Sequence, residues 1–143
     1  MAYSTYADVL EEMPGESVLI ELTDDPDFPS GQVDESKVAT AIARADGIID
    51  GYLSQRLETP VDPVPVAIKA ISVDLAIHAL YTRKEALPEQ RENRYKAAIA
   101  FLVRFARGDI GLGTLSAMDE DSPQWPRCYT PEQDFSEEIW AKY

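Results

Sequence analysis

Apolar residues recur at helical spacing along two long segments of the chain. In the first, which follows Asp34, they form one continuous face: Val38, Ala41, Ile42, Ala45, Ile49 and Tyr52. In the second, which begins at Pro88 and ends before Gly108, the same spacing joins Tyr95, Ile99, Leu102, Phe105 and Ala106. This pattern predicts two amphipathic helices. Asp34 is a suitable N-cap for the first, and Gly108 is a suitable C-cap for the second.

Residues 66–81, between these two segments, are apolar around most of a helix. The apolar positions are Ile68, Ile71, Val73, Leu75, Ile77 and Leu80. Since a helix that is apolar on nearly all sides is buried, we predict that this one lies at the centre of the fold. Three prolines, at positions 60, 63 and 65, predict an extended connection before it.

The N-terminal residues predict one short helix and leave a second element open. Thr5 and Asp8 are spaced as an N-cap and the third residue of a helix, which Pro14 and Gly15 end. Residues 17–22 form an apolar run that is too short to distinguish a helix from a strand. The predicted fold class is all-α, a small bundle of about four to five helices around a buried central helix.

The C-terminal part of the sequence differs from the rest. Glycines, prolines and three consecutive acids at 119–121 predict no sustained helix before about residue 136. The segment is nevertheless too apolar for a solvated linker, because it carries Trp125, Tyr129, Phe135, Ile139, Trp140 and Tyr143. We therefore predict a helical domain at 1–113 and an extended acidic and aromatic arm at 114–143. The aromatic anchors would contact either the chain's own body or a neighbouring subunit, and both alternatives stay open.

The net charge of −13, from 26 acids and 13 bases, excludes several classes of partner. A chain this acidic does not neutralise nucleic-acid phosphates as a whole, and anionic membrane surfaces repel it. We also expect no membrane span and no signal peptide, because no apolar run is long enough for a span. The charge is uneven, since residues 1–33 hold eight acids and no base, whereas residues 61–108 hold five acids and eight bases. Either these charges pair within one fold, or the acidic end of one copy meets the basic middle of another.

The residues that could carry catalysis form no complete constellation. Asp74 and His78 share a helix face, but the chain has no second histidine, so we expect a paired polar contact near the core. Cys128, the single cysteine, has no neighbour in sequence that would activate its thiol. We therefore predict that the protein is not an enzyme.

The clusters of acidic residues do not predict a metal site either. The spacing of Asp24, Asp25 and Asp27 does not fit a calcium-binding loop, and these acids are expected to form a turn. Asp46 and Asp50 lie one helical turn apart, and we expect two solvated carboxylates there. No metal and no cofactor is predicted.

An ordered set of short motifs runs through residues 3–113. From the N-terminus the motifs are YSTYAD at 3–8, LTD at 22–24, ADGIIDGYLSQR at 45–56, Pro60, VP at 64–65, DLA at 74–76, LY at 80–81, RY at 94–95, Leu102 and ARG at 106–108. This set resembles the small all-helical virion protein family of phage Mu and related prophages. That family is similar in turn to the head–tail connector (adaptor) proteins of tailed phages. Leu57 departs from the pattern, since an aromatic residue is expected there.

The resemblance implies a structural role in the virion without catalysis. It implies a ring, twelve-fold in the virion, that lies in the neck between the portal protein and the stopper or tail-completion protein. DNA would pass through an acidic passage without specific binding, the arm would reach the portal, and the protein would be made in the bacterial host cytoplasm. The resemblance also implies structural roles for Asp46, Ile49, Asp50, Tyr52, Leu53, Arg56, Pro65, Asp74 and Tyr81.

The net negative charge is also compatible with a second function. An acidic DNA mimic would bind a basic nuclease or repressor in place of DNA. This reading requires acids spaced regularly over one surface, and the net basic segment 61–108 argues against it.

Overall fold

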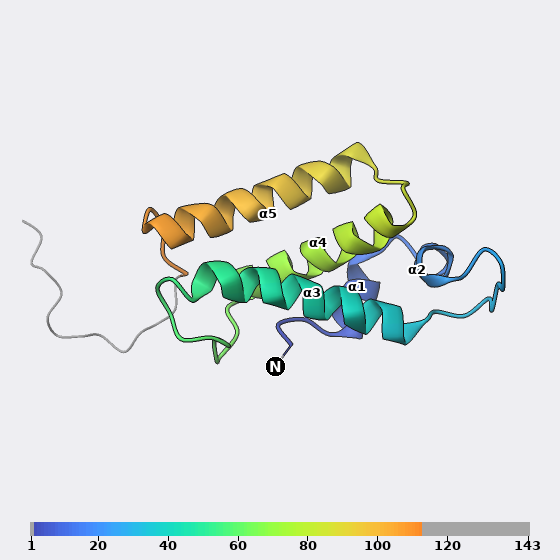
Figure 1. Cartoon of the computed structure of the whole chain (residues 1–143), viewed down its shortest axis with the longest axis horizontal. Helices are drawn as coiled ribbons and strands as arrows, with labels where there is room; N and C mark the ends of the chain where they lie inside the picture. Colours follow the sequence, from blue (N-terminus) through green and yellow to red (C-terminus); the bar gives the residue numbers. More distant parts are fainter. Residues whose placement is uncertain (1, 113–143) are drawn as a thin grey trace, which may run out of the picture.

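The computed structural model describes residues 2–112, which form five α-helices and no strand. The helices are α1 (Tyr6–Glu12), α2 (Glu16–Thr23), α3 (Glu35–Leu53), α4 (Val66–Arg83) and α5 (Glu89–Arg107). The three long helices lie side by side along the length of the molecule, and the two short ones lie against one end of them (Figure 1). The predicted all-α fold and its number of helices are confirmed.

The central helix is α4, as its apolar pattern predicts. It contacts all four other helices, and α3 also packs directly against α5. Its buried residues include Ile68, Ile71, Leu75, Ile77 and Leu80. The helix continues to Arg83, two residues beyond the predicted end. One contiguous core results, to which every described helix contributes.

The helix ends follow the predicted caps. The Thr5 side chain accepts a hydrogen bond from the Asp8 backbone N–H, and the Asp8 carboxylate accepts one from the Thr5 N–H in return. The Asp34 carboxylate accepts hydrogen bonds from the backbone N–H groups of the next helix's first turn. Gly108 ends α5 with a φ of 90°, in the left-handed region that glycine enters without steric cost.

The apolar run at 17–22, left open by the sequence, is part of α2. Leu19 and Leu22 are buried in the core, so tertiary packing decides between helix and strand here. Thr23, also buried, ends the helix by donating its hydroxyl proton to the Leu19 carbonyl at 2.9 Å. The same hydroxyl oxygen accepts from the Asp34 backbone N–H at 3.1 Å. This pair of bonds ties the end of α2 to the start of α3.

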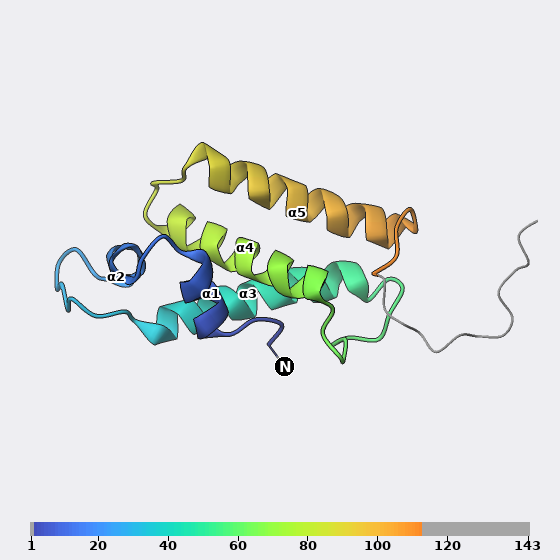
Figure 2. The same cartoon turned by 180° about the vertical axis from the view of Figure 1, so that it is seen from behind.

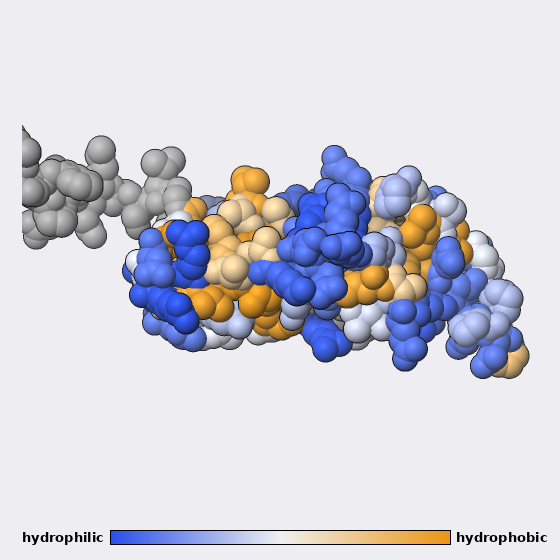
Figure 3. Space-filling model, turned by 90° about the horizontal axis from the view of Figure 1, so that it is seen from above, coloured by the Kyte–Doolittle hydropathy of each residue, from blue (hydrophilic) through white to orange (hydrophobic). Residues whose placement is uncertain are grey.

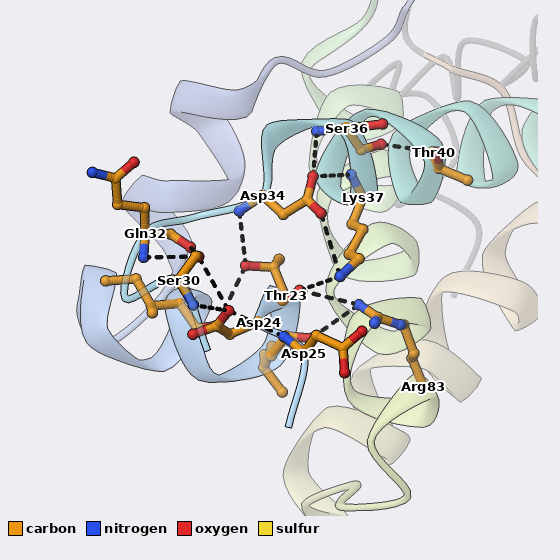
Figure 4. A network of polar contacts seen from close by, with 12 residues as sticks. Thr23, Asp24, Asp25, Ser30, Gln32, Asp34, Ser36, Lys37, Thr40 and Arg83 are labelled. Carbon is orange, nitrogen blue, oxygen red and sulfur yellow. Dashed lines mark hydrogen bonds and ion pairs between the residues drawn. The ribbon is translucent and has the colours of Figure 1, made fainter. Parts of the chain in front are cut away.

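The acidic loop after α2 is a turn, as predicted. The Asp24 carboxylate accepts hydrogen bonds from the backbone N–H groups of Ser30 at 2.8 Å and Gly31 at 3.1 Å (Figure 4). These backbone bonds lower the pKa of Asp24 to about 2. Within residues 2–112 no group of three or more His, Cys, Asp or Glu side chains could hold a metal ion.

Three cations surround the carbonyl oxygens at the C-terminal end of α2. Lys37 donates to the Thr23 carbonyl at 2.8 Å, and Arg83 lies 3.4 Å from the same oxygen (Figure 4). Lys84 donates to the Asp24 carbonyl at 2.8 Å. Since unpaired carbonyls give a helix C-terminus a partial negative charge, these cations from α3, from α4 and from the residue that follows α4 hold the short helix on the body.

The molecule has two distinct ends. The helix α2 and the loop at 24–34 form one end, and the described chain stops at the other, beyond the C-terminus of α5 (Figure 2). In the part of the chain that the structure describes, no helix is long and apolar enough to cross a membrane.

Candidate functional site

The N-terminal residues Tyr3 and Ser4 are buried between α3 and α4. Their exposed fractions are 3% and 2%, although they precede the first helix. The Tyr3 backbone N–H donates to Asp46 Oδ2 at 3.3 Å, and the Ser4 hydroxyl lies 2.8 Å from the Ser72 hydroxyl. The start of the chain is therefore fastened to α3 through Asp46 and to α4 through Ser72.

The hydroxyl groups of this cluster form a directed chain of hydrogen bonds. Ser72 donates its single proton to Asp46 Oδ1 at 2.9 Å. Because a serine hydroxyl has one proton to donate, Ser4 must be the donor to Ser72. Both oxygens of the Asp46 carboxylate thus have donors, one from α4 and one from the N-terminal backbone.

A second branch of the cluster begins at the Tyr3 ring. Its hydroxyl donates to Asp50 Oδ1 and accepts a hydrogen bond from the Val61 backbone N–H at 3.2 Å. Burial, followed by the hydrogen bond to Asp50, raises the pKa of Tyr3 to about 12. The N-terminus, α3 and the proline-rich connection at 59–65 are joined through one phenol group.

The expectation of two solvated carboxylates on α3 is wrong. Asp46 is only 8% exposed, and Asp50 is half-buried beneath Tyr3. Burial raises the pKa of Asp46, while its hydrogen bonds to Ser72 and the Tyr3 N–H oppose that rise. The helical pattern of α3 could not predict this, because the residues that cover the two acids come from remote parts of the chain.

The expected Asp74–His78 contact is replaced by two others. Asp74 pairs with Arg94 of α5, whose Nε lies 3.0 Å away, and Arg94 also contacts Glu12 of α1. The His78 ring stacks on Tyr95, with 3.8 Å between the ring centroids. Burial lowers the pKa of His78, so the neutral ring is favoured. Both side chains therefore fasten α5 to α4.

Arg56 fixes the point where the chain leaves α5. Its Nη1 donates to the carbonyl of Phe105 at 3.2 Å and lies 3.5 Å from that of Ile110. Its guanidinium carbon lies 5.3 Å from the centre of the Phe105 ring, within the range of a cation–π contact. It also lies against Gly108, where an added Cβ would come within 3.7 Å of it. One side chain after α3 thus sets the path of residues 108–112.

Comparison with known proteins assigns the family. The sequence profile described as "Bacteriophage Mu, Gp36" matches residues 3–127. The chain belongs to the Mu Gp36 family. It is also 35% identical over 94 residues to "Mu-like prophage FluMu protein gp36" of Haemophilus influenzae. That alignment covers 65% of this chain and 64% of the relative. The predicted resemblance to a Mu-like phage protein is confirmed, and this is a phage protein.

The remaining residues to which the family resemblance assigns structural roles are part of the framework. Ile49 and Leu53 are buried in the core, and Tyr52 and Tyr81 pack partly buried against it. Pro65 is the N-cap residue of α4. Leu57, which departs from the family pattern, is 38% exposed. The six aromatic and apolar residues of the predicted arm (Trp125, Tyr129, Phe135, Ile139, Trp140 and Tyr143) lie outside the described residues.

We expect Arg56→Ala to loosen the exit of the chain from α5. The variant loses bonds to two carbonyls and a ring contact, which should cost about 1 kcal/mol of unfolding free energy. Amide hydrogen exchange at residues 108–110 should accelerate more than exchange in the core. Arg44→Ala, at an exposed position of α3, is the control and should change neither quantity. Unchanged exchange at 108–110 in the Arg56 variant would contradict this role.

Proposed function

We propose that this Mu Gp36-family protein is a structural virion protein, a head–tail connector (adaptor). In this proposal, copies form a ring, twelve-fold in the virion, between the portal and the stopper or tail-completion protein. The protein would be made in the host cytoplasm and end in the neck of the virion. No catalytic step and no cofactor belongs to this role.

The observation that carries the proposal is the polarity of the molecule. A helical body presents α2 and the acidic loop at one end, and the described chain ends at the other (Figure 1). Arg56 holds that exit against α5. A body of this kind can join two different neighbours in a column, because each of its ends offers a different surface.

The distribution of charge supports passage of DNA through such a ring. All eight charged side chains of residues 1–33 are acidic. On α1, α2 and the following loop, several of them are exposed, among them Glu11, Glu16, Glu21, Asp25 and Asp27. A wall of this sign repels phosphates, so duplex DNA can slide without being held.

The test is capture of the purified full chain by its cognate portal rings, followed by electron microscopy of the complex. We expect Trp125→Ala/Phe135→Ala/Trp140→Ala to weaken capture by about 30-fold or more, because buried aromatic anchors commonly dominate an interface. Deletion of residues 114–143 should have at least the same effect. The control variant replaces the acids at 119–121 by their amides, which changes the charge of the arm and keeps its aromatic residues.

Each outcome of this test has a distinct meaning. Absence of capture by the full chain removes the connector proposal. Capture that survives the arm deletion leaves the connector role and removes the arm as the portal-binding element. Tight binding to a DNA-processing enzyme, competed by DNA, would instead favour the acidic DNA mimic. The basic residues exposed on α5, among them Arg104 and Arg107, count against the mimic, because they interrupt a DNA-like surface.

A further inference from the structure

A groove runs between α3 and the N-terminal residues. It has a volume of about 670 Å³. Its α3 wall carries the acids Glu35, Asp46 and Asp50 around a row of small residues, Ala39, Ala43 and Gly47. No lysine or arginine is among its lining residues.

The small residues leave room for another helix. Apart from the chain neighbours and the backbone of its own helix, a Cβ placed on Gly47 would meet no atom within 4 Å, so the space in front of this helical turn is open. Ala43 and Ala39, about one and two turns earlier, are also exposed. Helices approach each other most closely where such short side chains face the partner. The groove can therefore accept a helix that has short side chains in the middle of its contact face and basic side chains beside them.

The outer face of α5 has these properties. Ala97 and Ala100 are exposed in its middle, beside Lys96, Arg104 and Arg107. Lys96 pairs with Glu92 at 2.7 Å, whereas Arg104 and Arg107 form no ion pair within residues 2–112. The view onto this side of the molecule shows apolar patches next to strongly hydrophilic ones (Figure 3).

The two faces point in different directions, so a copy cannot use its own α5 to fill its own groove. Arg44 and Ile48, on the side of α3 near α5, line a hollow with Tyr95. Ala43 and Gly47 project from another side of the α3 helix, toward the N-terminal residues that border the groove. In Figure 1, α5 and the N-terminus lie on opposite sides of the body.

We propose that the basic outer face of α5 in one copy docks into the acidic groove of α3 in a second copy. Arg104 and Arg107 supply positive charge where the exposed Glu35 and the half-buried Asp50 supply negative charge. The contact joins two different surfaces, so each copy retains one free α5 face and one free groove. A contact of this head-to-tail type continues from copy to copy, and it gives a ring where the rotation between copies closes and an open filament where it does not. The closure into a ring between portal and tail rests on the proposed function, whereas the pairwise contact does not.

The test is a mixing experiment with two full-length variants. One carries Arg104→Glu and Arg107→Glu on α5. The other carries Glu35→Lys and Gly47→Lys in the groove. Sedimentation of each variant alone should show self-association about tenfold or more weaker than that of the wild-type chain, because like charges then face each other. An equimolar mixture should regain self-association, because the wild-type α5 face of one variant meets the wild-type groove of the other and the two mutated faces also carry opposite charges. Arg44→Glu changes the same charge outside both faces and should associate as the wild-type chain does.

Several results would overturn the contact. These are a wild-type chain that stays monomeric up to about millimolar concentration, wild-type association in the α5 variant, or a mixture that stays monomeric. Thermal melting of each variant, monitored by circular dichroism, confirms that it is folded before it is scored. Portal capture is measured separately. If self-association fails while portal capture persists, the proposed contact is wrong and the connector proposal stands. If self-association is found while portal capture fails, the contact between copies stands and the connector proposal is wrong.

Discussion

Ile77→Ala should lower the free energy of unfolding by about 2–5 kcal/mol, because it removes buried methyl and methylene groups and leaves a cavity. Ile77 is 0% exposed and lies in α4, the helix that every other described helix contacts. A cavity there cannot be filled by movement of one surface element, since the neighbouring helices also hold each other. We therefore expect a value in the upper part of that range.

Urea unfolding measured by circular dichroism checks this expectation. The matched control is Val66→Ala in the same helix, where the side chain is 85% exposed and the change should stay within about 0.5 kcal/mol. The melting temperature of the Ile77 variant should fall by about 10 °C or more. Equal losses for the two variants would mean that α4 is not the centre of the fold.

Ser72→Ala should cost about 1.5–3 kcal/mol, although it removes a single oxygen atom. The hydroxyl of Ser72 is the donor to the buried Asp46 carboxylate and the acceptor for Ser4. Its removal leaves a charged group short of a donor and the Ser4 hydroxyl short of an acceptor, both in a buried site. The attachment of the N-terminal residues to α4 is lost with it.

The cost of Ser72→Ala should depend on pH. Burial raises the pKa of Asp46 in the folded state, and the bond from Ser72 opposes that rise, so the variant's pKa should lie higher still. A carboxyl group with a raised folded pKa stabilises the fold below its unfolded pKa, and that stabilisation is lost as the pH rises through the folded pKa. The variant should therefore be closer to the wild-type chain at about pH 4 than at about pH 7.

Urea midpoints of the two proteins at both pH values test this expectation. Ser54→Ala, at an exposed position after α3, removes the same atom from the surface and should show a small cost without this pH dependence. If the cost of Ser72→Ala were the same at both pH values, that cost would not come from the hydrogen bond that the Ser72 hydroxyl donates to the ionised Asp46 carboxylate.

Some features of the structure depend on residues that are close in sequence, and others depend on residues that are far apart in it. The cap at Asp34, the end of α5 at Gly108 and the burial of Ile77 each depend on residues within about one or two helical turns, which a linear pattern contains. The environment of Asp46 depends on Tyr3, 43 positions away, and on Ser72, 26 positions away. Arg56 likewise contacts the carbonyl of a residue 49 positions further along.

The sequence by itself determined the helical class, the three long helices, the central place of α4 and the family, because spacing and short motifs carry that information directly. Only the tertiary structure decided that the run at 17–22 is helical, that Asp46 and Asp50 are covered by the N-terminus, and that His78 stacks on Tyr95 instead of meeting Asp74. The physical reason is that a side chain's hydrogen bonds, burial and pKa depend on which distant segments pack against it. Those contacts form only when the five helices and their connections pack around one core.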